Sequence, residues 1–204
     1  GSAMYGLAQL RDLGLDPRSE PAVRAVGLVR DNVRFYEGNQ PFFTGEVEPC
    51  INGKVVAAGA YFGQNVRGVV DRLLGEQLDD GGWNCEAERG STRSSFHTTI
   101  DVLEGLLEHE RATGGSTEVT AARHGGEEYL LERRLFRSMT TGTVVNSTWR
   151  LFSFPPQWHY DVLRGLEYLR RAGVAPDERV AEAIDLVESK RNDDGRWLLD
   201  VQYP

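Results

Sequence analysis

Two cysteines and two of the four histidines are the residues of this chain whose types suit a metal site. They are Cys50, Cys85, His97 and His159, and the carboxylate of Glu48, two positions before the first cysteine, offers an alternative ligand. Two thiolates and two imidazoles suit Zn²⁺, which favours tetrahedral coordination by nitrogen and sulfur. Because these residues are far apart in the sequence, the elements that carry them decide whether they meet.

The sequence contains a repeat that ends in Asp-Asp-Gly-x-Trp. Residues 66–83 and 180–197 align without a gap and share this ending. The residues before each ending are apolar at a spacing of three to four, which predicts an amphipathic helix. The glycine permits the left-handed conformation that ends a helix, and the tryptophan can fold back over the next apolar face. The acidic pair is therefore interpreted as part of a helix-ending turn and not as a proton donor.

A second repeated element precedes the first, as Asp-Val-Leu-x-Gly-Leu at residues 101–106 and 161–166. A glycine recurs at one position of this element, at Gly6, Gly59, Gly105 and Gly165. Glycine costs about 1 kcal/mol inside a helix, so the recurrence predicts close approach between helices. The repeating unit is a helix, a short connection, a second helix and a turn.

The pattern predicts an all-α fold built from helical hairpins, an α/α toroid of about four hairpins in a single domain over residues 1–204. The expected first helices of the hairpins span residues 4–13, 51–62, 96–109 and 158–172. The expected second helices span residues 21–33, 66–77, 117–136 and 177–190. Residues 1–4 look like a cloning scar. The interrupted repeat at both ends predicts a fragment or incomplete ring, with an apolar edge that missing hairpins or a partner protein would cover.

The repeat also predicts where the candidate ligands lie. Alignment of Gly59 with Gly105 places Cys50 opposite Phe96 and next to His97, at the start of adjacent inner helices. The expected site is therefore at the amino-terminal end of these helices, at one mouth of the ring.

The other two candidate ligands are expected at the same mouth. His159 opens the next inner helix, and Cys85 follows a turn that leads back toward that end. Asp101 lies one turn after His97 and could orient its imidazole, so these two residues are the candidate catalytic pair. Two other interpretations stay open: a structural cluster of core cysteines and histidines, and a disulfide between the cysteines, which a cytoplasmic setting disfavours.

Three aromatic residues are candidates for the lining of a cavity at this mouth: Phe96, Trp158 and Tyr160. Aromatic rings there would suit an isoprenoid cation or tail. Ordinary core packing is the alternative explanation for the same residues.

Residues 77–83 form the motif Gln-x-x-Asp-Gly-Gly-Trp, and a later copy has Arg191 in place of Gln. Together with the hairpins between them, these motifs resemble the squalene/hopene cyclase and protein prenyltransferase β-subunit superfamily. The resemblance covers most of the chain. It implies an α/α toroid whose inner helices surround an apolar cavity that holds an isoprenoid. The D-x-D-D motif of class II cyclases and the D-D-x-x-D motif of class I synthases are absent from the sequence.

The likeness to the prenyltransferases extends to their zinc site. Glu48-Pro49-Cys50 resembles the Asp-x-Cys pair that binds zinc in that family, with Glu in place of Asp. Residues 93–106, with His97-Thr98, resemble the stretch that supplies the zinc-binding histidine. The resemblance thus implies Zn²⁺ held by Cys50 and His97, where it would activate a thiolate or polarise a substrate oxygen.

Composition excludes several other classes. The formal net charge of −8 disfavours nucleic acid as a partner, because phosphate binding requires an excess of Lys and Arg. No apolar run approaches the roughly 20 residues of a transmembrane helix, and two cysteines form no disulfide framework, so a cytoplasmic location is expected.

The first functional hypothesis is a cyclase- or prenyltransferase-like protein with an apolar ligand and zinc. The alternative is a non-catalytic toroid domain that binds a protein or ligand.

Overall fold

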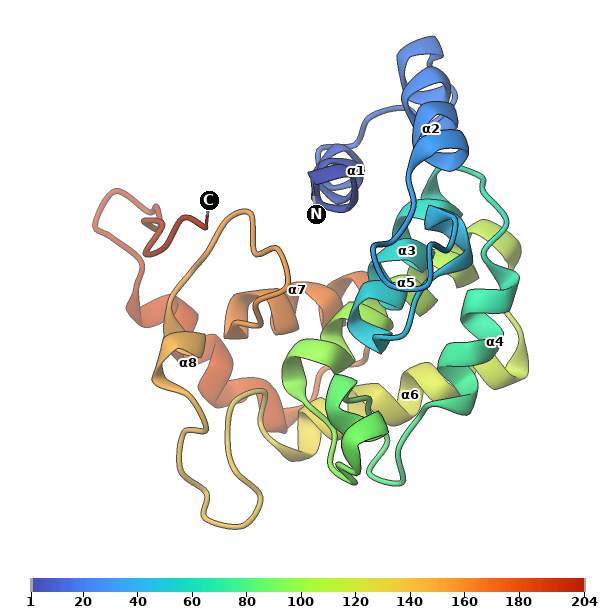
Figure 1. Ribbon diagram of the computed structural model, residues 1–204. Coiled ribbons are helices and arrows are strands. Elements are labelled where there is room, and N and C mark those ends of the chain that lie inside the picture. The colour runs from blue at the N-terminus through green and yellow to red at the C-terminus, as the bar shows by residue number, and fades with distance from the viewer. Residues whose placement is uncertain (1, 204) are drawn as a thin grey trace. The chain divides into compact units, whose positions relative to one another are not determined.

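The computed structural model describes residues 2–203 (Figure 1), and their regular secondary structure is helical apart from isolated β-bridges. The α-helices are α1 (Ser2–Asp12), α2 (Glu20–Asn32), α3 (Pro49–Tyr61), α4 (Arg67–Gly75), α5 (Phe96–Thr113), α6 (Thr117–Glu132), α7 (Val162–Ala172) and α8 (Ala181–Ser189). Short 3₁₀ helices are η1 (Phe42–Thr44), η2 (Cys85–Arg89), η3 (Ser147–Arg150) and η4 (Glu178–Val180). The predicted all-α class is confirmed, and each predicted helix has a counterpart.

The chain divides into two compact units between Gly126 and Glu127, inside α6. The first unit contains α1 to α5 and most of α6, and the second contains α7 and α8. The single domain predicted over residues 1–204 stays a prediction. The cloning scar expected at residues 1–4 includes Gly1, which lies outside the described residues, whereas the other three positions begin α1.

Local hydrogen bonding explains where two predicted helix ends differ from the structure. The helix expected from residue 158 begins at Val162, because the Asp161 side chain accepts a hydrogen bond from the Arg164 amide at 2.8 Å and caps the helix there. The helix expected to reach residue 136 ends at Glu132, since Arg134 and Leu135 have φ angles of +46° and +66°. Such angles cannot continue a right-handed helix.

The centre of the first unit is the contact between α3 and α5 (Figure 1). The two backbones meet at Gly53 and Gly105, where a Cβ built on Gly105 would lie 2.4 Å from the Gly53 carbonyl oxygen. A Cβ on Gly53 would in turn lie 2.4 Å from the Asp101 carbonyl oxygen. This crossing therefore requires glycine on both helices, and of the two only Gly105 was expected from the repeat.

The other recurring glycines have different neighbours. A Cβ on Gly6 would meet nothing within 4 Å. Gly59 packs against the Val66 side chain and Gly165 against the Tyr160 hydroxyl. Close approach of helix backbones is therefore the explanation for Gly105 but the wrong one for these three positions.

The two Asp-Asp-Gly-x-Trp turns are called here the first clasp (residues 77–83) and the second clasp (residues 191–197), and each makes the same hydrogen bond to the helix before it. The Trp83 indole donates to the Leu73 carbonyl at 2.7 Å, and the Trp197 indole donates to the Val187 carbonyl at 2.6 Å. Each tryptophan thus folds back over the helix that precedes its clasp. The repeat seen in the sequence is a repeat of structure.

The two clasps differ in what covers them. Trp83 is fully buried, and a Cβ on Gly81 would lie 2.5 Å from the carbonyl oxygen of Gly125 in α6. Trp197 is 44% exposed, and the side chain nearest to Gly195 is that of Arg191, within its own clasp. None of the helices in the described part of the chain is both long and apolar enough to cross a membrane.

Candidate metal and thiol site

The site lies where α3 begins. Glu48 precedes the helix in an extended conformation and Pro49 occupies the first turn, a position that suits proline because its missing N–H has no partner there. Cys50 follows in the same turn. Cys85 opens η2 directly after the first clasp, and the Asn84 side chain fixes that start by accepting from the backbone amide of the second η2 residue.

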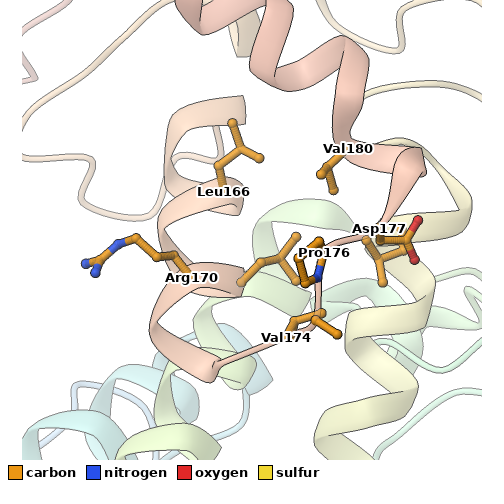
Figure 2. A pocket seen from close by; sticks show the side chains of 9 residues that line it. Leu166, Arg170, Val174, Pro176, Asp177 and Val180 are labelled. Carbon is orange, nitrogen blue, oxygen red and sulfur yellow. The ribbon is translucent and has the colours of Figure 1, made fainter.

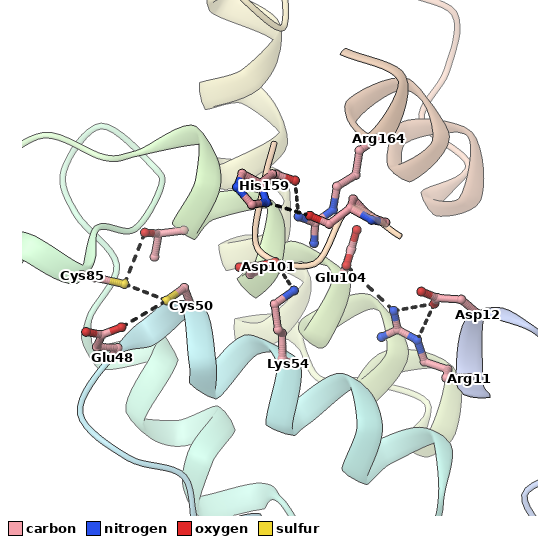
Figure 3. Close-up of polar contacts among 12 residues, drawn as sticks. Arg11, Asp12, Glu48, Cys50, Lys54, Cys85, Asp101, Glu104, His159 and Arg164 are labelled. Carbon is pink, nitrogen blue, oxygen red and sulfur yellow. Dashed lines mark hydrogen bonds and ion pairs between the residues drawn. The ribbon is translucent and has the colours of Figure 1, made fainter. Parts of the chain in front are cut away.

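The two sulfur atoms face one another, 3.0 Å apart (Figure 3). The Cys50 thiol donates to Glu48 Oε2 at 3.6 Å, and Cys85 Sγ lies 3.4 Å from the Thr98 hydroxyl of α5. The potential ligand atoms of Glu48, Cys50 and Cys85 all lie within 4.8 Å of one another. Both cysteines are partly exposed and the glutamate is exposed, so solvent reaches the set.

Burial and mutual contact shift the pKa values of the two thiols in opposite directions. The pKa of Cys85 is lowered, chiefly by its side-chain contact with Cys50 and further by its contact with the Thr98 hydroxyl. The pKa of Cys50 is raised by the same contact, by burial and by the negative charge of Cys85. Cys85 is therefore the sulfur that ionises first, and Cys50 is the one that keeps its proton longer.

His97 is the second residue of α5 and is not a member of this set. The helix geometry gives the reason. Thr98 points its hydroxyl at Cys85, and successive residues of an α-helix point about 100° apart. The histidine one position earlier therefore faces a different direction, and its role as a ligand stays a prediction.

His159 lies in the second unit. Its Nδ1 is 3.3 Å from the Pro156 carbonyl oxygen, and its ring stacks on Trp158 and Tyr203 with centroid distances of 3.9 and 3.5 Å. These contacts occupy one ring nitrogen and both faces of the imidazole. Its predicted role as a zinc ligand is likewise left as a prediction.

Asp101, expected to orient His97, forms an ion pair with Lys54, and its role beside His97 stays a prediction. Lys54 Nζ lies 2.7 Å from Asp101 Oδ1, and the exposures of the two side chains are 8% and 0% (Figure 3). A charge buried to this degree requires a partner of opposite sign. Lys54 was not singled out from the sequence, although it is the one charged residue of an otherwise uncharged α3, one turn after Cys50.

Two of the three aromatic residues proposed for a cavity lining are buried, and the third is exposed. Phe96 is buried at the start of α5. Tyr160 is buried and donates its hydroxyl to the Leu135 carbonyl at 2.7 Å, and burial raises the pKa of this phenol. Trp158 is 47% exposed. Contact of these residues with an isoprenoid stays a prediction.

A small hollow lies between α7 and the segment that leads to α8 (Figure 2). Its volume is about 150 Å³, and its walls include Leu166, Val174 and Val180, with Arg170 and Asp177 at the edge. Pockets for small-molecule ligands usually have volumes of about 300–1,000 Å³. This hollow is too small for an isoprenoid of prenyltransferase size, so the thiol pair is the better candidate for chemistry.

No protein-family model, curated protein or solved structure matches the chain. The functional conclusion therefore depends on the repeat, on the two clasps and above all on the set formed by Glu48, Cys50 and Cys85.

Proposed function

We propose that this chain is a cyclase- or prenyltransferase-like α/α-toroid protein that binds Zn²⁺ through Glu48, Cys50 and Cys85. The observation that carries the proposal is the meeting of two thiols and a carboxylate within 4.8 Å. The hairpin order of the helices and the two matching clasps support the toroid arrangement. The resemblance of Glu48-Pro49-Cys50 to a zinc-binding Asp-x-Cys pair supports the choice of metal.

The donor set suits a zinc ion with an open coordination position. Two thiolates and one carboxylate supply three ligands, and zinc with three protein ligands keeps a fourth place for water or substrate. When bound, the metal would activate a thiolate or polarise an oxygen of the substrate. In the alternative of a closed, four-coordinate site, the resemblance proposes His97 as the fourth protein ligand.

The residues of the chain prepare this site for a cation. Cys85 loses its proton readily because its pKa is lowered by contact with Cys50. Cys50, whose pKa is raised by contact with Cys85, gives up its proton more readily when a cation offsets the second negative charge. The Lys54–Asp101 pair fixes α3 to α5 one turn behind the thiols.

Elemental analysis of the purified, reduced chain tests the proposal. The expected result is one equivalent of zinc at neutral pH, lost in Cys50→Ser and in Cys85→Ser. Glu86→Gln is the matched control, because Glu86 is an exposed carboxylate beside Cys85 that does not belong to the set. Absence of zinc from the reduced wild-type chain would overturn the proposal.

The apolar ligand is proposed from the resemblance, and native mass spectrometry for a co-purified lipid tests it. The cytoplasmic location expected from the cysteine content also stays a prediction. It would leave both thiols reduced and available to a metal.

A non-catalytic binding role is the second candidate function, and the second clasp favours it. Trp197, Leu198 and Leu199 are 44%, 72% and 52% exposed. The corresponding tryptophan of the first clasp is fully buried. Exposed apolar surface of this kind marks binding sites for proteins, so a protein partner would protect residues 197–199 from hydrogen exchange and shift the fluorescence of Trp197.

A further inference from the structure

Cys50 and Cys85 are 35 positions apart in the sequence, yet their sulfur atoms lie 3.0 Å apart. Both are free thiols and both are partly exposed. The chain contains no other cysteine. When an oxidant reacts with one thiol, the second thiol is therefore already close enough to attack the oxidised sulfur.

We propose that this pair is a redox modification site, which low-molecular-weight disulfides convert into an intramolecular Cys50–Cys85 disulfide. The inference does not rest on the proposed function, because the conversion needs no metal and no substrate of the toroid. It requires that the two sulfur atoms approach, that an oxidant has access and that the surrounding contacts permit the bond.

The approach required is small. A disulfide bond is about 2.05 Å long, so the sulfurs must close by about 1 Å from their present separation. They lie on different elements, Cys50 in the first turn of α3 and Cys85 at the start of η2. A change of about 1 Å between two sulfur atoms is within the range of rotation about cysteine side-chain bonds.

The contacts that the thiols give up are replaceable. Cys50 donates to Glu48, whose exposed carboxylate is hydrated when the thiol withdraws. The other contact of Cys85 is with the Thr98 hydroxyl at 3.4 Å, and thiols are weak hydrogen-bond partners. The neighbouring Asn84 cap keeps η2 in place throughout, because it does not involve the sulfur.

The chemistry is thiol–disulfide exchange in two steps. One cysteine thiolate attacks a sulfur of the small disulfide RSSR, forms a mixed disulfide and releases RS⁻. The second cysteine, as its thiolate, attacks the cysteine sulfur of the mixed disulfide and releases the second RS⁻. Two cysteine thiols lose two protons and two electrons, and RSSR is reduced to two RSH.

The oxidised and reduced forms differ in what they bind. The disulfide removes both thiolates, and thiolates are the species that bind zinc. It also links the start of α3 covalently to the segment after the first clasp. Oxidation would thus remove the two thiolates that the proposed zinc site requires.

The test uses the full chain, reduced, freed of metal with a chelator and incubated with mixtures of reduced and oxidised glutathione. After alkylation of the remaining thiols, intact mass should show the loss of two hydrogen atoms, and a digest should contain the Cys50 and Cys85 peptides joined. Because a well-oriented intramolecular step has a very high effective concentration, the internal disulfide should exceed the mixed disulfide by at least about 100-fold. Stable adducts with one or two glutathiones, or two alkylated thiols under oxidising mixtures, would overturn the inference.

Variants separate this inference from the zinc proposal. Cys50→Ser and Cys85→Ser should each stop at the mixed disulfide, with circular dichroism checking that each variant is folded. Peptide mapping of the wild-type chain tests the bond even where a variant fails to fold. Zinc content is measured separately on the reduced chain, so a chain can fail to bind zinc and still form the disulfide, or the reverse.

Discussion

Replacement of Lys54 by Met tests the buried ion pair between α3 and α5. Lys54 Nζ lies 2.7 Å from Asp101 Oδ1, and the two side chains are 8% and 0% exposed. Breaking a buried ion pair by removing one of its partners costs about 3–5 kcal/mol. We expect Lys54→Met to lower the free energy of unfolding by that amount.

A double variant and a surface control make this prediction sharp. Lys54→Met combined with Asp101→Asn removes both charges, so it should recover more than half of the loss. Arg67→Met breaks a pair with Asp71 whose N···O distance is 4.0 Å and whose side chains are 85% and 66% exposed. Exposed pairs contribute about 0–1 kcal/mol, so this control should have little effect.

Urea denaturation followed by circular dichroism compares the midpoint and slope of five proteins: the wild type, Lys54→Met, Asp101→Asn, the double variant and Arg67→Met. The reasoning is refuted if Lys54→Met costs no more than the surface control. It is also refuted if the double variant loses the sum of the two single losses, because the partners would then act independently.

Three further predictions follow from the clasps, the helix crossing and the thiols. Trp83→Phe should destabilise the protein by about 2–4 kcal/mol, since it removes a buried indole and its hydrogen bond to a backbone carbonyl. Trp197→Phe should cost under about 1 kcal/mol, because the indole of Trp197 is 44% exposed. Thermal unfolding of the two variants and the wild type measures the difference. Gly105→Ala should destabilise the protein by about 1–3 kcal/mol or more, because its Cβ would lie 2.4 Å from a carbonyl oxygen of α3. Gly6→Ala, which adds a Cβ in open space, should be neutral or stabilising by up to about 1 kcal/mol. Equal effects of the two variants in denaturant titrations would contradict the packing at Gly105. Cys85 should be alkylated faster than Cys50 at neutral pH, because a lowered pKa increases the fraction of Cys85 that is thiolate. Its alkylation rate should also rise at a lower pH than that of an ordinary thiol. Peptide mapping after brief iodoacetamide treatment measures the labelling of each cysteine, and preferential labelling of Cys50 would contradict the prediction.

The helices were predictable because their signals are local. Apolar spacing of three to four residues identifies α4 and α8 in the two copies of the repeat, and the turn glycines mark where their clasps close. The errors at helix ends also have local causes, but the spacing of apolar residues does not reveal them. A capping bond from Asp161 and the left-handed pair at residues 134–135 set those ends.

The site was predictable only in part. The turn after Trp83 predicts that Cys85 returns to the end of the inner helices where Cys50 lies, and the two sulfur atoms are 3.0 Å apart. It does not fix the rotation of α5, and one residue of rotation decides whether Thr98 or His97 faces the sulfurs. Lys54 was missed because its partner is 47 positions away, and pairing across such a separation follows from the crossing at the glycines and not from periodicity.

Titration of the reduced, metal-free chain with Co²⁺ tests the central claim most directly, because Co²⁺ occupies zinc sites and thiolate coordination to it gives a strong absorption band. The account predicts that the band saturates at one equivalent, disappears on addition of Zn²⁺ and is lost in Cys50→Ser and Cys85→Ser but not in Glu86→Gln. A reduced, folded wild-type chain that shows no such band, or a band that survives removal of either cysteine, would contradict it.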